Sequence, residues 1–169
     1  CPSAAVAAST AAFAVNGVYQ AFPQGLAQAL EVKVARTANR LLPTAFILTA
    51  LYAGSFGLVL LLGGQTLLAG FRPAGDAAFL RLFGETARPL ILILGVKALF
   101  ESAVQILQAD LRGRHRTLTV FRIQFGSSLL FWVPLFLTVR ALHPTIPALW
   151  LTMVACSALS TFLLARQTA

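Results

Sequence analysis

Five long apolar segments, separated by shorter polar stretches, are the feature that most constrains this chain. A helix needs about 20 apolar residues to cross the hydrocarbon core of a membrane, and each segment reaches or approaches that length. The ten-residue alternation of membrane β-barrel strands is missing, so every span is predicted to be helical. We predict an all-α, polytopic membrane helix bundle that forms a single unit over residues 1–169. Its five transmembrane helices are expected at residues 4–30, 41–70, 89–109, 117–139 and 146–165.

The composition supports a membrane protein. Of the 169 residues, 58% are hydrophobic and only 11% are charged, whereas about 25% of the residues of a soluble domain are charged. The remaining polar surface is too small to keep a compact globule in water, which excludes a soluble enzyme. The net charge of +8 could indicate a nucleic-acid partner, but the basic residues lie between the apolar segments rather than along one face. Basic loops explain this distribution better, so the predicted partner is the lipid bilayer and not nucleic acid.

Catalytic and metal-binding motifs are missing from the sequence. It contains no Gly-x-Ser-x-Gly, P-loop or His-Glu-x-x-His pattern. Neither the two cysteines nor the two histidines have a partner at metal-ligand spacing. We therefore predict no enzymatic activity, no cofactor and no metal site.

The connection at residues 71–88 is too long for a tight turn. Its second half mixes apolar and charged residues, which favours an amphipathic interfacial segment or an extended start of the third helix. A polar loop is the alternative. Three prolines are predicted near helix starts, where a missing N–H costs little. They are Pro43, Pro89 and Pro147.

The distribution of basic residues predicts the orientation, because cytoplasmic loops carry an excess of Lys and Arg. With five spans, eight basic residues fall on one side and four on the other. The first side is therefore predicted to be cytoplasmic, which places the N-terminus outside and the C-terminus inside. The two groups are Lys33, Arg36, Arg40, Arg112, Arg114, Arg116, Arg122 and Arg166, against Arg72, Arg81, Arg88 and Arg140.

The first span carries a stripe of amide side chains. Asn16, Gln20, Gln24 and Gln28 are each four residues apart, so they share one face of a helix. An amide that faces lipid has no hydrogen-bond partner, and we expect this face to be turned inward. The amides either hold the bundle together through hydrogen bonds between helices or line a cavity that binds substrate.

The third span contains two ionisable residues together with two amides, Lys97, Glu101, Gln105 and Gln108, at steps of four, four and three. Charges inside a span are costly unless they pair or meet water, which makes this face a functional candidate. Lys97 and Glu101 are one turn apart and are expected to pair. One hypothesis gives them a role in ion coupling or substrate contact. The alternative is that they neutralise each other near a membrane surface, with Lys97 extending outward.

Three short motifs carry a family resemblance. Residues 23–29 read Pro-Gln-Gly-Leu-Ala-Gln-Ala, residues 111–113 read Leu-Arg-Gly, and the last two spans contain Phe-Trp-Val-Pro at 131–134 and Leu-Trp-Leu at 149–151. In these motifs, in helix order and in loop length, nearly the whole chain resembles the multidrug and toxic compound extrusion (MATE) family of secondary transporters.

The resemblance implies one lobe of a twelve-helix transporter. Many bacterial members carry an acidic residue ten positions before the Leu of Leu-Arg-Gly in the C-terminal lobe, and Glu101 stands ten before Leu111. This correspondence implies helices eight to twelve, a role in cation coupling for Glu101, and a central cavity bordered by the amides of the first span. The family usually has Asp at the coupling position, and Lys97 is not part of its pattern.

The function implied is a secondary active antiporter of the plasma membrane, which exports drugs or metabolites in exchange for protons or sodium by alternating access. Its other partners would be a small-molecule substrate, such as an organic cation or another amphiphile, and the missing N-terminal lobe. One alternative is a flippase for lipid-linked precursors, whose cavity should present basic residues. Another is a non-transporting scaffold or remnant, which would tolerate substitution of Glu101 and Gln24.

Overall fold

The computed structural model describes residues 2–37, 41–70, 77–142 and 145–168 of the chain. Within these ranges the chain forms helices and no strand, which confirms the predicted all-α fold. The helices are α1 (Pro2–Thr37), α2 (Leu42–Ala69), α3 (Ala77–Gly113), α4 (Thr117–Leu142) and α5 (Ile146–Thr168).

Two of the three prolines predicted near helix starts lie there, and the third does not. Pro43 and Pro147 are the second residues of α2 and α5, as predicted. The prediction for Pro89 is wrong, because α3 begins at Ala77 and Pro89 lies inside it. The extended start of the third helix is therefore the correct interpretation for residues 77–88, and the polar loop is not. Phe83 and Ala87 of this segment are buried in a core cluster with residues of α1 and α2, and this packing supports the helix before Pro89.

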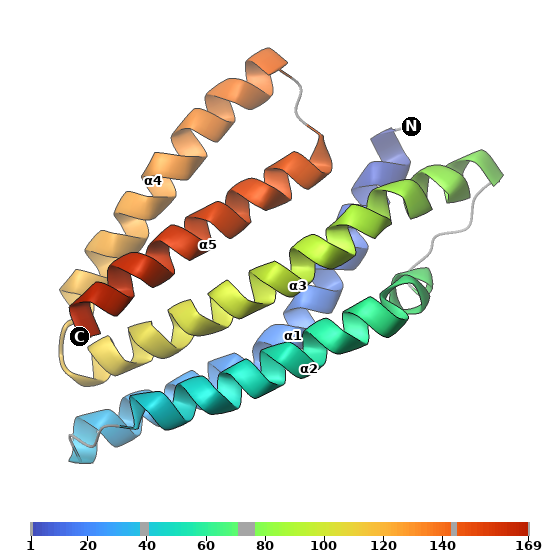
Figure 1. Ribbon diagram of the computed structural model, residues 1–169. Coiled ribbons are helices and arrows are strands. Elements are labelled where there is room, and N and C mark those ends of the chain that lie inside the picture. The colour runs from blue at the N-terminus through green and yellow to red at the C-terminus, as the bar shows by residue number, and fades with distance from the viewer. Residues whose placement is uncertain (1, 38–40, 71–76, 143–144, 169) are drawn as a thin grey trace.

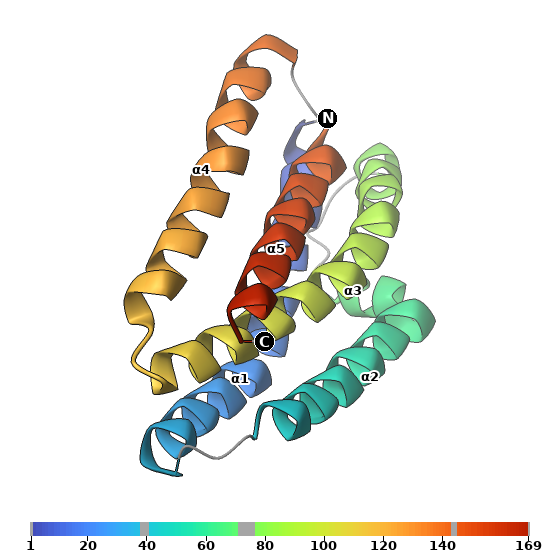
Figure 2. The same cartoon turned by 60° about the vertical axis from the view of Figure 1, so that its left-hand side comes forward.

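The third helix is the centre of the bundle (Figure 1). It packs against α1, α2 and α5, while α4 packs mainly on α5. Both views place α2 and α4 at opposite edges of the bundle (Figure 2). The largest core cluster joins Ala-rich positions of α1 to Leu90, Ile91 and Leu94 of α3 and to Trp150 of α5. Small side chains on α1 let its backbone approach α3 closely.

A glycine fixes the close approach of α1 and α3 at the other end of this interface. A Cβ atom on Gly113 would lie 2.8 Å from the Cβ of Val34 and 2.9 Å from the carbonyl oxygen of Glu31. Nearby, Nε of Arg112 lies 3.3 Å from Oε2 of Glu31. Only a glycine leaves room for this contact, which gives the Leu-Arg-Gly sequence a structural reason.

Among the described residues, four helices are long and apolar enough to cross a membrane, and they are α2, α3, α4 and α5. Large apolar side chains are exposed on them, such as Leu62 at 81% and Phe136 at 72%, as expected for surfaces that face lipid. The first helix has 36 residues but is not among these candidate spans. A fifth span therefore stays a prediction, and so do the orientation and the plasma membrane. Of the basic residues counted for orientation, Arg40 and Arg72 lie outside the described residues.

Candidate functional site

A polar cavity of about 350 Å³ lies among α1, α3, α4 and α5. We call it the polar cavity, and most of its lining is amide, carboxylate, thiol and hydroxyl. Its residues are Asn16, Gln20, Gln24, Glu101, Val104, Gln105, Gln124, Cys156, Ser157 and Ser160. Because these helices are otherwise apolar, such a concentration of polar groups requires partners or water within the bundle.

Glu101 is the centre of a hydrogen-bond network in the wall of the polar cavity. Its Oε1 accepts from Nζ of Lys97 and its Oε2 accepts from Nε2 of Gln20. Nε2 of Gln105 in turn donates to Oε1 of Gln20. The side chain of Glu101 keeps 23% of its surface exposed, so the carboxylate is bonded on both oxygens and still faces the cavity. The network joins α1 to α3, because Gln20 comes from one helix and its partners from the other.

The side chain of Lys97 is enclosed within the bundle. It is only 2% exposed, and Nζ lies 5.7 Å from the centre of the Trp150 ring, a cation–π distance. The alternative in which Lys97 extends outward is therefore wrong. Lys97 is also not part of the lining of the polar cavity, so its charge is directed to Glu101 and to an aromatic face.

The position of Glu101 along α3 is far from both charged ends of the helix. It is 13 residues after Arg88 and nine before Asp110, which correspond to about 20 Å and about 14 Å at 1.5 Å per residue. The whole of α3, with 37 residues, is about 55 Å long, well beyond the hydrocarbon core of about 30 Å. Glu101 thus belongs to the apolar stretch and not to either polar end.

The amide stripe of α1 is divided between the cavity and the surface. Asn16 and Gln20 are buried, and Gln24 lines the polar cavity although it is exposed. Gln28 is exposed and Gln108 is half-buried, and neither lines the cavity. The stripe drifts around the helix by about 40° per four residues, which carries its last member off the inner face.

Two amide oxygens of the polar cavity accept no hydrogen bond from the residues that the structure describes. They are Oδ1 of Asn16 and Oε1 of Gln105, and both are buried. A buried polar atom without a partner is costly, so these oxygens favour a cavity that contains water or a ligand with donors or positive charge. Together with the Glu101 carboxylate, they form a set of oxygen acceptors suited to a cation.

An aromatic cluster holds Gln20 in place. The hydroxyl of the preceding residue, Tyr19, contacts the hydroxyl of Ser102 and donates to the carbonyl oxygen of Ala98 at 3.1 Å. The hydroxyl of Tyr52, on α2, donates to the backbone oxygen of Tyr19 at 3.2 Å. These bonds attach one turn of α1 to both neighbours, and the neighbouring amide is thereby aimed at Glu101.

Sequence reasoning missed the contribution of α4 and of Cys156. Gln124 and Cys156 line the polar cavity, and Ser127 of α4 is 2.8 Å from Ser160 of α5 between hydroxyl oxygens. The isolated amide of Gln124 within an apolar span was the available signal. Among the described residues, no cluster of three His, Cys, Asp or Glu could hold a metal ion.

Comparison with protein-family models, curated proteins and solved structures finds no match to this chain. The site is therefore interpreted from its own geometry.

Proposed function

We propose that this chain is part of a secondary active antiporter, which exports small organic molecules in exchange for protons or sodium by alternating access, with Glu101 as the cation site. The observation that carries the proposal is the place of Glu101. Its carboxylate lies in the apolar stretch of α3, accepts bonds from Lys97 and Gln20, and faces a cavity. Ionisable groups inside membrane spans typically mark ion or substrate pathways.

The network offers a route from cation binding to helix movement. A proton or sodium ion on Glu101 competes with Lys97 and Gln20 for the same two oxygens. Gln20 is on α1, so loss of its bond removes a polar link between α1 and α3. The cation then favours a conformation in which this link is absent, which is the differential affinity that gradient-driven transport requires.

The substrate that best fits the lining is an organic cation or another amphiphile with hydrogen-bond donors. Asn16 and Gln105 present acceptor oxygens that the protein leaves unused, and Glu101 adds negative charge. The missing lobe of the implied twelve-helix protein would complete the cavity on the side that this chain leaves open.

The flippase alternative has less support. A carrier of anionic headgroups should present basic residues to its cavity, whereas the lining of the polar cavity contains neither Lys nor Arg. A non-transporting scaffold has no need for the acceptor set, and the experiment below distinguishes it from a transporter.

The test compares two Glu→Gln substitutions on α3. Cells that express the full-length protein to which the chain belongs are loaded with ethidium, an organic cation, and its loss is followed by fluorescence while the proton or the sodium gradient is collapsed. We expect Glu101→Gln to abolish gradient-driven efflux at unchanged expression, and the matched control Glu85→Gln to retain it. Glu85 is suitable because it makes the same type of ion pair on the surface of α3.

Three outcomes are decisive. Efflux by the Glu101→Gln protein at the original rate would remove Glu101 from the mechanism. Absence of gradient-driven efflux from the unsubstituted full-length protein at verified membrane expression would favour the scaffold. Loss of efflux in Glu85→Gln as well would show that the effect is not specific to the cavity.

A further inference from the structure

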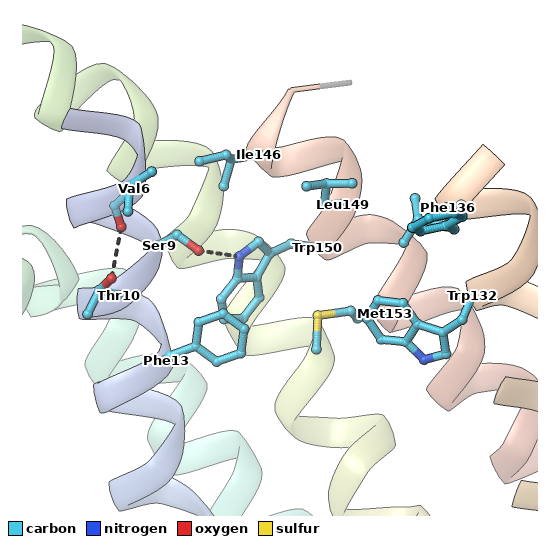
Figure 3. Close-up of a pocket in the computed structure, with 11 residues that line it drawn as sticks. Val6, Ser9, Thr10, Phe13, Trp132, Phe136, Ile146, Leu149, Trp150 and Met153 are labelled. Carbon is cyan, nitrogen blue, oxygen red and sulfur yellow. Dashed lines mark hydrogen bonds between the residues drawn. The ribbon is translucent and has the colours of Figure 1, made fainter. Parts of the chain in front are cut away.

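A second, apolar pocket is lined by α1, α4 and α5, which are three of the four helices that line the polar cavity. Its volume is about 440 Å³, and we call it the apolar pocket. Figure 3 shows side chains from all three helices converging on it. The lining is Val6, Ser9, Thr10, Phe13, Trp132, Leu135, Phe136, Ile146, Leu149, Trp150 and Met153.

The lining offers a ligand almost no polar contact. It contains no charged side chain, and its two hydroxyls already make hydrogen bonds. Oγ of Ser9 accepts from Nε1 of Trp150 at 3.1 Å, and Oγ1 of Thr10 donates to the backbone oxygen of Val6 at 3.0 Å (Figure 3). A polar or ionic ligand would therefore lose its hydration without compensation, so the pocket favours pure hydrocarbon.

The apolar pocket lies where the backbones of α1 and α4 are apart. Within the described residues the backbone of α4 comes close to those of α5 and α3 but not to that of α1. The space between them is closed on one side by Trp150 of α5, whose ring packs on Phe13 with centroids 4.6 Å apart. On the other side, Trp132 and Phe136 of α4 are 50% and 72% exposed. The wall of the pocket thus continues into the outer surface of the bundle.

Because the wall of the apolar pocket continues into the outer surface of the bundle, its ligand can be inferred from what covers that surface. The exposed apolar surface of membrane spans is solvated by lipid chains, which are present at far higher concentration than any dissolved compound. An uncharged pocket that opens onto this surface can be filled by hydrocarbon without the loss of any hydrogen bond. We propose that the apolar pocket binds an acyl chain of a phospholipid from the surrounding bilayer, which fills the gap between α1 and α4.

A bound acyl chain would act as a packing element. It lies between α4 and α1, whose backbones are apart, and next to Trp150, whose ring contacts Lys97. The inference does not depend on transport, since a scaffold with the same three helices would bind the same chain.

The tryptophans provide a direct test, because both tryptophans of the chain line this pocket. The variant Trp132→Phe leaves Trp150, which is only 2% exposed and is shielded from lipid outside the bundle. The full-length variant is placed in phosphatidylcholine vesicles whose acyl chains are brominated or unbrominated. Bromine quenches indole fluorescence at close contact, so we expect brominated chains to quench most of the Trp150 emission.

A pair of Leu→Phe substitutions on α5 provides the control. Leu149→Phe, added to Trp132→Phe, narrows the pocket and should restore Trp150 emission. Leu151→Phe adds the same ring at a position that is 55% exposed and outside the lining, and it should leave the quenching unchanged. Val6→Phe narrows the pocket from α1 and serves if the first variant does not fold.

Each other result overturns the proposal. Unquenched Trp150 would show that lipid chains do not enter. Quenching that persists in both narrowed variants would place the bromine outside the pocket. Quenching that disappears as the protein-to-lipid ratio rises would identify a second copy of the chain as the occupant.

Discussion

Two ion pairs on α3, Arg81–Glu85 near its start and Lys97–Glu101 in its interior, are alike in spacing and opposite in environment. Arg81 and Glu85 are four residues apart with Nε and Oε1 at 2.9 Å, and their side chains are 81% and 57% exposed. Lys97 and Glu101 have the same spacing, but their side chains are 2% and 23% exposed. Helical spacing predicts that both pairs form, whereas only the surroundings decide what each pair does.

The difference follows from the cost of removing charge from water. The charges of an exposed pair stay hydrated in both the folded and the unfolded chain, so the pair contributes little to the free energy of unfolding. In a buried pair each charge depends on its partner, so removal of one leaves the other uncompensated. Lys97 and Glu101 can therefore respond strongly to a cation that competes for the carboxylate, and Arg81 and Glu85 cannot.

The largest effect is expected for Lys97→Met. The variant keeps an apolar stem of similar length but leaves Glu101 charged and without its cation partner. We expect the free energy of unfolding, measured by denaturing-detergent titration in mixed micelles, to fall by about 3 to 5 kcal/mol. The double variant Lys97→Met with Glu101→Leu should recover most of this loss, because no isolated charge remains. If Lys97→Met lowered the free energy of unfolding no more than a substitution in the Arg81–Glu85 pair, the two pairs would not differ in the way that their burial predicts.

A smaller effect is expected for Gln20→Met, which removes the bond from α1 to Glu101 and leaves Lys97 in place. A hydrogen bond to a charged group contributes about 2 kcal/mol to stability, and we expect a loss of that size in the same titration. Gln28→Met is the matched control, because Gln28 belongs to the same stripe but is exposed. Equal losses of stability from both substitutions would mean that Gln20 stabilises α1 itself and that its hydrogen bond to Glu101 contributes nothing measurable.

The contacts and burial predicted from the sequence are confirmed where one helix contains the whole pattern. The pairing of Lys97 with Glu101 needs only a spacing of four residues, and so does the inward face of Asn16 and Gln20. The helical fold follows from the long apolar segments in the same way. These features are local, because the geometry of a single helix fixes them.

The rest depends on how helices pack, which periodicity does not specify. Gln28 continues the stripe, but the drift of the stripe around α1 carries it off the inner face. Gln124 and Cys156 enter the cavity because α4 and α5 happen to meet there, and Trp150 meets Lys97 across a helix interface. Pro89 lies inside α3 and not at its start, because the residues before it pack on α1 and α2 and support the helix there.

A third pair on α3 sharpens the comparison, because it mixes the two environments. Asp110 is fully buried, while Arg114 is 42% exposed, with Nε of Arg114 2.9 Å from Oδ2 of Asp110 and Nη2 3.1 Å from Oδ1. We expect Asp110→Asn to lower the free energy of unfolding by about 1 kcal/mol, since solvent screens the arginine and the amide keeps one acceptor. A loss as large as that of Lys97→Met would show that burial of a single partner is sufficient.

The smallest effect is expected for Glu85→Gln, where both partners are exposed. Water replaces the carboxylate as the hydrogen-bond partner of Arg81, so the unfolding titration should change little at low salt. Added salt should remove even that change, because ions screen charges at the surface. The salt dependence provides a further test. The loss caused by Lys97→Met should persist in high salt, because Lys97 is only 2% exposed and salt screens a buried pair much less than a surface pair. If salt abolished both losses equally, Lys97 and Glu101 would be in contact with bulk solvent, and the pair would lack the isolation that makes it responsive to a single bound cation.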